Sequence, residues 1–355
     1  MTEKKWTKLF ILGMAVFVLL AGLTVGIIDP FFHYHAPLPG FYYVLDDQRS
    51  QNDGITRNFE YNAILLGTSH IEQFRSSYAD ELFGVDSVKL PYPGATLREM
   101  NEDLLRAFDT HDDIRLVIRT VDQSYLLDGK DAMHLEMGEY PTWLYNRNPF
   151  DDIRYWLNRD VLFKYCARTV LRRLSGVQPG HTSFDDYSAV DASYFSKKNA
   201  VGDRWSFDPA PEQMPSLTDE ERESIRENVR QNINAVAGEH PETQFICFVP
   251  PESILRWGAR AESGELMRQL EANEIAVQTM LECDNIRVFN FTAQPEIILD
   301  LDNYKDNVHY STEIADRLLL YMSRGECEVT GDNAEAVSEA VRTYFSEFDY
   351  NSVLK

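Results

Sequence analysis

Three residues of the sequence have the types and the chain order of a nucleophilic site, namely Ser69, Asp306 and His309. A serine hydroxyl becomes a nucleophile when a neighbouring base removes its proton, and a histidine imidazole can serve as that base. Asp306 lies one helical turn before His309, so its carboxylate can reach the other ring nitrogen and fix the tautomer and orientation of the imidazole. This set predicts acyl transfer through a serine ester, provided that the fold brings Ser69 to His309.

Each of these residues also has an ordinary structural interpretation. A serine that follows a strand usually caps the next helix, and an aspartate shortly before a histidine is a common arrangement. The stretch DNYKDNVHYS (302–311) on its own indicates a polar turn before a helix that Ser311 can cap. The catalytic hypothesis therefore depends on the two ends of the chain meeting in the fold.

The elements that must position these residues are short apolar runs that alternate with helical patterns. The runs are YNAILLGTS (61–69), VDSVKLPYPG (85–94), IRLVIRTVD (114–122), TQFICFVPP (243–251) and IRVFNF (286–291). Such runs are typical of strands in a parallel sheet that is covered on both faces. Helical patterns follow at 97–111, 218–236, 264–283 and 311–325. The alternation predicts an α/β fold, a doubly wound parallel sheet of about five strands with helices on both faces.

Small and polar residues follow most of these predicted strands. In a doubly wound sheet, ligands bind outside the carboxyl ends of the strands. We therefore expect five segments to converge on one edge of the sheet: Gly67–His70, Pro93–Gly94, Asp122–Gln123, Pro250–Glu252 and Asp306–His309.

The N-terminus carries the clearest physical signal. Three lysines within the first eight residues precede LFILGMAVFVLLAGLTVGII (Leu9–Ile28), which contains no charge and is long enough to span a bilayer as a helix. The positive-inside rule then keeps the N-terminus in the cytoplasm and exports the rest. A cleaved signal peptide is the alternative, but the run is longer than a usual signal core and has no A-x-A-like end. We expect a single-pass cell-membrane protein with an extracytoplasmic C-terminal domain.

The chain is thus expected to have four parts. Residues 1–28 form the cytoplasmic tip and the signal anchor, 29–58 a juxtamembrane segment, 59–324 the α/β domain, and 325–355 an acidic C-terminal tail. Residues 126–217 are expected to form an aromatic-rich insertion within the α/β domain.

Composition excludes some partners and ligands. The chain has 57 Asp and Glu against 34 Lys and Arg, a net charge of -23, which repels phosphates and argues against a nucleic-acid partner. His33 and His35 share one side of an extended chain, but two ligands do not make a metal site. No C-x-x-C pair indicates a zinc site, and no disulfide pairing is predicted, for the four cysteines Cys166, Cys247, Cys283 and Cys327.

Three blocks of the sequence together resemble those of the SGNH (GDSL-like) hydrolase superfamily. They are GTS with Ser69, YPG with Gly94, and DNVH with Asp306 and His309, and the resemblance covers residues 60 to 324. It implies that Ser69 is the nucleophile, that His309 is the general base and that Asp306 orients His309. It also implies that the backbone N–H groups of Ser69 and Gly94 form part of an oxyanion hole.

Two positions depart from the pattern of this superfamily. The aspartate of its G-D-S block is replaced by Thr68, and the asparagine of its third block is missing from RTVDQS (119–124). Asp122 or Gln123 occupies that place. An ionised aspartate cannot donate a hydrogen bond, so Gln123 is the candidate for a further oxyanion donor.

An N-terminal anchor followed by such a domain resembles DltD-type teichoic acid D-alanylation proteins and the SGNH partners of membrane-bound O-acyltransferases. The resemblance implies a serine esterase or O-acyltransferase that acts on acyl esters of cell-surface glycan or teichoic-acid-like polymers. It implies no metal and no organic cofactor, and a membrane-bound O-acyltransferase as a partner. The alternative is a catalytically weak SGNH-like domain that acts as a scaffold or binds a glycan.

Overall fold

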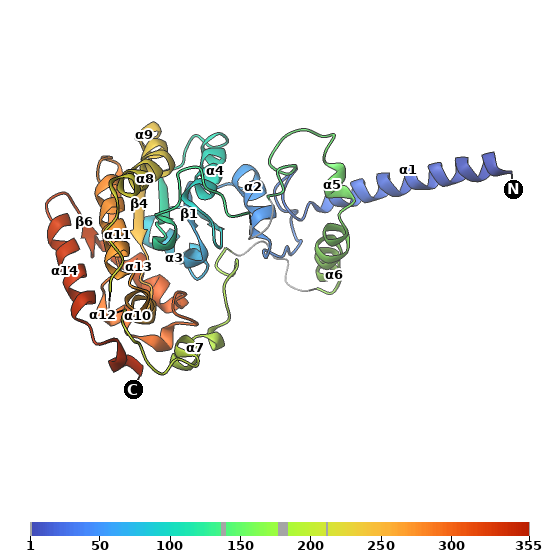
Figure 1. The fold of residues 1–355 in the computed structure, drawn as a ribbon. Coiled ribbons are helices and arrows are strands. Elements are labelled where there is room, and N and C mark those ends of the chain that lie inside the picture. Colours follow the sequence, from blue (N-terminus) through green and yellow to red (C-terminus); the bar gives the residue numbers. More distant parts are fainter. Residues whose placement is uncertain (1, 136–139, 177–183, 211, 355) are drawn as a thin grey trace. The chain divides into compact units, whose positions relative to one another are not determined.

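The computed structural model describes residues 2–135, 140–176, 184–210 and 212–354 (Figure 1). The chain divides into two compact units. One contains residues 1–60 and 138–183, and the other contains residues 61–137 and 184–355. The first unit is helical, and the second contains the sheet.

A six-stranded sheet forms the centre of the second unit, in the order β2-β1-β3-β4-β5-β6. The first five strands are parallel, and the short β6 pairs antiparallel with β5. Every residue of β1, β2 and β3 is buried, as is typical of a parallel sheet covered on both faces. The strands are β1 (Ala63–Gly67), β2 (Ser87–Pro91), β3 (Leu116–Thr120), β4 (Gln244–Val249), β5 (Ile286–Asn290) and β6 (Glu328–Val329). The predicted α/β class is confirmed, and β6 adds an antiparallel edge strand.

Helices pack on both faces of this sheet. On one face, Leu65, Ile118 and Phe248 belong to a core that α3, α10 and α13 complete. On the other face, the buried Arg119 donates to the backbone carbonyls of Leu97 and Asn232. The helices of this unit are α3 (Ser76–Phe83), α4 (Leu97–Phe108), α7 (Lys197–Val201), α8 (Asp219–Val229), α9 (Ala235–Glu239), α10 (Ile254–Ser263), α11 (Leu266–Met280), α12 (Pro295–Ile298), α13 (Thr312–Arg324) and α14 (Ala334–Glu347).

Shorter helical turns connect these elements. The π-helical segment η6 (Arg230–Asn234) joins α8 to α9, so the helix predicted over 218–236 contains a π turn near its end. The other turns of this unit are η1 (Ser69–Ile71), η2 (Gln123–Tyr125), η5 (Ala192–Tyr194), η7 (Leu301–Asn303) and η8 (Tyr350–Leu354).

The sequence signals for helix starts are confirmed at two places. Thr218 accepts from the backbone N–H of Glu221 and the Glu221 carboxylate accepts from Thr218, which completes a capping box. Ser311 accepts from the N–H of Ile314 at the start of α13. The residues after 325 also contribute to this unit, because Phe345 of α14 stacks on the buried Trp257 with ring centroids 4.2 Å apart.

The first unit is built around an apolar helix, α1 (Glu3–Ile28), which is long and apolar enough to cross a membrane. Length and composition alone support this, and a signal sequence has the same properties. The unit also contains α2 (Gln48–Asn58), α5 (Ile153–Trp156), the π-helical segment η4 (Val161–Cys166) and α6 (Ala167–Leu174).

A buried carboxylate joins α1 to the rest of this unit. Asp29 ends α1 in the left-handed conformation, with φ 46°. Its carboxylate accepts from the backbone N–H groups of His33, Tyr34 and His35 and from the hydroxyl of Tyr155. A carboxylate buried with several donors is stable in place, so Asp29 fixes the turn that follows α1.

The end of β1 requires a glycine. A Cβ added to Gly67 would lie 2.4 Å from the hydroxyl oxygen of Thr120 on the adjacent strand β3. That hydroxyl accepts from the N–H of Thr68 at 3.3 Å, so Thr120 also holds the first residue after β1. The close contact between the ends of β1 and β3 therefore fixes the backbone position of the residues just before Ser69.

We predict that Gly67→Ala lowers the free energy of unfolding by about 1–3 kcal/mol, because the new methyl group must displace Thr120. The control is Gly238→Ala in α9, where an added Cβ meets nothing within 4 Å. This control should raise the free energy of unfolding by about 0.5 kcal/mol. Chemical denaturation of the full chain in detergent measures both effects. Equal effects of the two variants would contradict a close approach at Gly67.

Candidate active site

The parallel register places the segments after β1, β2 and β3 on one edge of the sheet. Gly67 at the end of β1 lies opposite Pro91 of β2, and the N–H of Tyr92 donates to the carbonyl of Gly67 at 2.7 Å. On the other side of β1, Leu66 lies opposite Arg119 of β3. The loops that carry Ser69, Gly94 and Asp122 therefore leave the sheet side by side, as the sequence predicted.

Ser69 is the first residue of the helical turn η1. The preceding Thr68 is the N-cap, and its hydroxyl accepts from the N–H of His70. Ser69 is partly exposed, whereas Thr68 and His70 are buried. The Ser69 side chain therefore reaches the surface, whereas the side chains of Thr68 and His70 on either side of it are buried.

The loop with Asp306 and His309 is ordered by its own hydrogen bonds. One carboxylate oxygen of Asp306 accepts from the backbone N–H groups of Val308 and His309 at 2.8 and 2.9 Å. The carbonyl of Asn307 accepts from both the N–H and the hydroxyl of Ser253, which anchors the loop to the segment after β4. Asp306 therefore shapes the turn that presents His309.

The structure brings Ser69, His309 and Asp306 together. His309 Nε2 lies 2.7 Å from Ser69 Oγ, and His309 Nδ1 lies 2.7 Å from the second carboxylate oxygen of Asp306. With Nδ1–H donating to Asp306, Nε2 is free to accept from the Ser69 hydroxyl. These distances are within the range that general-base catalysis requires.

Asp306 carries its charge at neutral pH. Burial would raise the pKa of this carboxyl, but hydrogen bonds from the His309 ring and from two backbone N–H groups outweigh that effect and lower the pKa to about 2. An ionised Asp306 fixes the tautomer of His309 and stabilises the imidazolium that forms when His309 takes a proton.

Two backbone N–H groups in the segments after β1 and β2 are the oxyanion donors that the resemblance implies. Across the described part of the chain, the hydrogen bonds include no acceptor for the N–H of Ser69 or of Gly94. Gly94 has φ 70°, a left-handed conformation that glycine adopts without strain, and its carbonyl contacts Nδ1 of His134 at 2.7 Å. Both N–H groups follow neighbouring strands on the same edge of the sheet, so both stay candidates for an oxyanion hole.

Gln123, the expected further donor, has other partners. Its amide nitrogen donates to the carbonyl of Pro250 at 2.9 Å, and its amide oxygen accepts from Asn273 of α11 at 2.6 Å. The residue is only 1% exposed. Both polar atoms of this amide are therefore engaged in the interior, where they join the end of β3 to the end of β4.

A buried contact between His70 and Asp122 lies beside Ser69. One carboxylate oxygen of Asp122 accepts from the Thr68 hydroxyl at 2.9 Å and lies 3.2 Å from Nδ1 of His70. The other oxygen accepts from the N–H of Ser124. Burial lowers the pKa of His70, but the charge and hydrogen bond of Asp122 outweigh it and raise that pKa. Burial raises the pKa of Asp122, but His70 and these donors hold it well below its usual range.

This pair cannot be predicted from the sequence. His70 and Asp122 lie at two predicted strand ends, but their contact depends on the register of β1 against β3. The spacing along the chain contains no signal for that register. The pair fastens the loop that bears Ser69 to the neighbouring strand.

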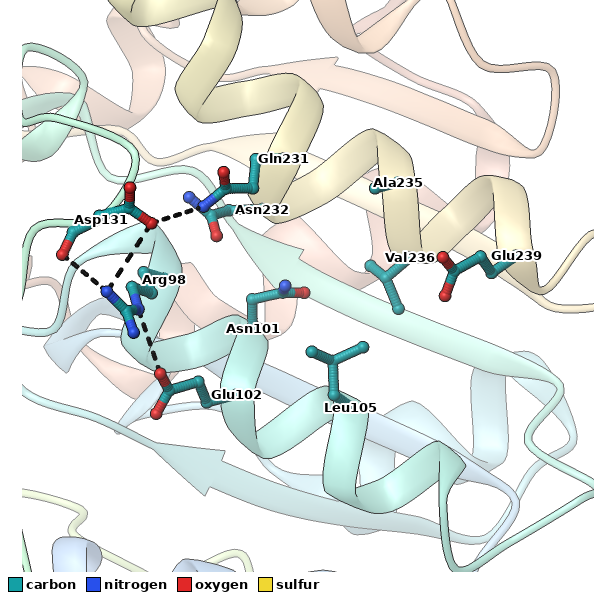
Figure 2. A pocket seen from close by; sticks show the side chains of 10 residues that line it. All are labelled: Arg98, Asn101, Glu102, Leu105, Asp131, Gln231, Asn232, Ala235, Val236 and Glu239. Atoms are coloured by element: carbon teal, nitrogen blue, oxygen red, sulfur yellow. Dashed lines mark hydrogen bonds and ion pairs between the residues drawn. The ribbon is translucent and has the colours of Figure 1, made fainter.

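A groove of about 350 Å³ lies elsewhere in this unit, between α4 and the η6–α9 helix. Figure 2 shows that Arg98 pairs with Asp131 and Glu102 in this lining, and that Gln231 donates to Asp131. Its lining contains none of the triad residues. The groove is therefore distinct from the site at Ser69.

Comparison with known proteins gives no family assignment, because neither a protein-family model nor a curated protein matches the chain. Within the residues described by the structure, no group of three or more His, Cys, Asp or Glu side chains is placed to hold a metal ion. The geometry around Ser69 is therefore the basis for assigning a function.

We predict that Asp122→Asn lowers the free energy of unfolding by about 3 kcal/mol, because it removes the carboxylate that the buried His70 contacts. The double variant Asp122→Asn with His70→Gln should recover part of that loss, since no buried imidazole is left without its partner. Chemical denaturation of the wild type, the two single variants and the double variant gives the coupling free energy. Additive effects of the two substitutions would contradict a direct interaction at this position.

Proposed function

We propose that the chain is an SGNH-type serine esterase or O-acyltransferase that acts outside the cell membrane. Its substrates would be acyl esters of cell-surface glycan or teichoic-acid-like polymers. The observation that carries the proposal is the continuous hydrogen-bonded chain from Ser69 Oγ through His309 to an ionised Asp306. An activated serine nucleophile requires a hydroxyl, a base that takes its proton and a carboxylate that orients the base, and these three groups are bonded here in that order.

In the proposed reaction, Ser69 Oγ attacks the acyl carbon while His309 Nε2 takes the hydroxyl proton. The N–H groups of Ser69 and Gly94 donate to the oxygen that becomes negative. The ester bond then breaks, and His309 returns its proton to the departing alcohol oxygen. In hydrolysis, water gives up a proton to His309 while its oxygen attacks the acyl carbon; the bond to Ser69 Oγ then breaks, His309 returns the proton to Oγ, and the free acid leaves. In transfer, a sugar or polyol hydroxyl attacks in the same way and leaves as a new ester. Both reactions regenerate Ser69.

The SGNH assignment is supported by the positions of the sequence blocks on the parallel sheet. GTS begins at the last residue of β1, YPG follows β2 and DNVH precedes α13, so all three blocks lie at or beyond element ends, where an α/β site can use them. Thr68 lacks the carboxylate that the G-D-S block places in this turn. Asp122 supplies a carboxylate to the same turn from the end of β3. We infer that this neighbouring residue compensates for the substitution.

The proposed location rests on the first unit. α1 is long and apolar enough to cross a membrane, and the lysines of the N-terminal segment precede its apolar part. By the positive-inside rule, the residues after α1 would lie outside the cytoplasm. A site in that location would meet cell-surface polymers.

A catalytically weak domain that binds a glycan or a membrane-bound O-acyltransferase is the second candidate. The observation that favours it is the engagement of the Gln123 amide in the interior, which leaves two backbone donors for the oxyanion. Loss of one oxyanion donor typically reduces turnover by about 10²–10³-fold. Slow turnover that still depends on Ser69 would therefore favour a weak enzyme.

We predict that the full chain in detergent hydrolyses simple acetyl esters, and that Ser69→Ala and His309→Gln each lower kcat by at least about 10³-fold. Ser323→Ala is the matched control, because Ser323 lies on α13 and its hydroxyl only bonds the carbonyl of Leu320. This control should keep the wild-type rate. Turnover that is absent from the wild type, or unchanged in Ser69→Ala, would contradict the enzymatic proposal and favour the binding role.

A further inference from the structure

The first unit exposes large apolar side chains outside α1. Within residues 147–174 they include Phe150 (89% exposed) and Leu174 (78% exposed). The complete set of exposed apolar residues in this segment is Phe150, Ile153, Leu157, Phe163, Leu171 and Leu174. Single exposed apolar residues are ordinary on protein surfaces, but a group within one short helical segment marks an interaction surface.

Helical spacing gathers these side chains into stripes. Phe163, Leu171 and Leu174 are separated by eight and three residues along η4 and α6, which places them on one helical face. Ile153 and Leu157 are four residues apart and likewise share a face. The faces opposite these stripes are covered, since Tyr155, Val161 and Thr169 are buried.

The same segment has a charge opposite to that of the whole chain. Residues 147–174 contain seven Lys and Arg against three Asp, whereas the chain as a whole carries a net charge of -23. One of these aspartates, Asp152, is buried against His33 and Tyr34. Exposed arginines flank the apolar stripes, namely Arg147, Arg154, Arg159 and Arg173. Apolar side chains bordered by cations suit an anionic lipid surface.

The segment is also next to α1 near the end of its apolar stretch. α5 and η4 pack against α1, and a Cβ added to Gly22 would lie 3.1 Å from the ring of Trp156. Gly22 precedes the end of α1 at Ile28 by about 9 Å of helix rise. In Figure 1, α6 runs across the direction of α1 near that end. A helix in this orientation would lie along the surface of a bilayer that α1 crosses.

We propose that residues 147–174 form a second membrane contact that lies in the surface of an anionic bilayer beside α1. Phe163, Leu171 and Leu174 enter the boundary between headgroups and acyl chains, and the flanking arginines bind lipid phosphates while their stems lie along the apolar layer. Trp156 donates to the hydroxyl of Tyr34, an aromatic pair of the kind that prefers the headgroup layer. The proposal is independent of the chemistry at Ser69.

The test places a fluorescent probe on the exposed stripe in the full chain. Leu171→Cys is labelled with a thiol-reactive fluorophore after reconstitution into vesicles of neutral lipid with and without about one-third anionic lipid. The matched control is Leu105→Cys, a partly exposed leucine on α4 of the second unit. The wild-type chain is labelled in parallel to subtract the four native cysteines. Quenching by spin-labelled lipid reports immersion in the bilayer, and quenching by iodide reports contact with water.

In anionic vesicles the Leu171 probe should be quenched by lipid several-fold more strongly than the Leu105 probe and be protected from iodide. Arg154→Glu with Arg173→Glu should weaken that quenching in anionic vesicles and leave it unchanged in neutral ones. A Leu171 probe that iodide reaches as freely as the Leu105 probe would overturn the proposal and leave a protein partner as the occupant of this surface. Lipid quenching that changes neither with anionic lipid nor with the arginine substitutions would overturn the proposed binding of lipid phosphates by the arginines.

Discussion

The arrangement of the candidate site depends on His70, the buried residue that follows Ser69. Its ring is paired with Asp122 at the end of β3, and its backbone carbonyl accepts from the hydroxyl of Tyr310 at 2.7 Å. Tyr310 directly follows His309. A single residue therefore fastens the loop of the proposed nucleophile to a neighbouring strand and to the loop of the proposed base. The 2.7 Å contact between Ser69 and His309 is a consequence of this connection, although the two residues are 240 positions apart.

The sequence predicts the elements well where the physical signal is local. Apolar runs such as AILLG identify buried strands, because a parallel sheet covered on both faces tolerates few polar residues. Thr218 and Ser311 mark helix starts, since a side-chain oxygen must satisfy free backbone N–H groups there. The blocks with Ser69 and His309 follow from the same reasoning, because strand ends of one parallel sheet share an edge.

The remaining features depend on contacts that are distant along the chain. The pairing of His70 with Asp122 requires the register of β1 against β3, and the orientation of Gln123 requires the position of Asn273 on α11. In the first unit, the carboxylate of Asp29 is bound by the hydroxyl of Tyr155, 126 residues further along. Side-chain hydrogen bonds of this kind are set by tertiary packing, and local spacing along the sequence does not encode them.

We propose that Ser69 is a nucleophile activated by His309, and covalent labelling tests this role most directly. The full chain is treated with a fluorophosphonate, and the modified residue is located by peptide mass spectrometry, in parallel with Ser69→Ala and His309→Gln. We expect an adduct on Ser69 that disappears in Ser69→Ala and forms far more slowly in His309→Gln. No adduct on Ser69, or one that forms equally fast without His309, would contradict it.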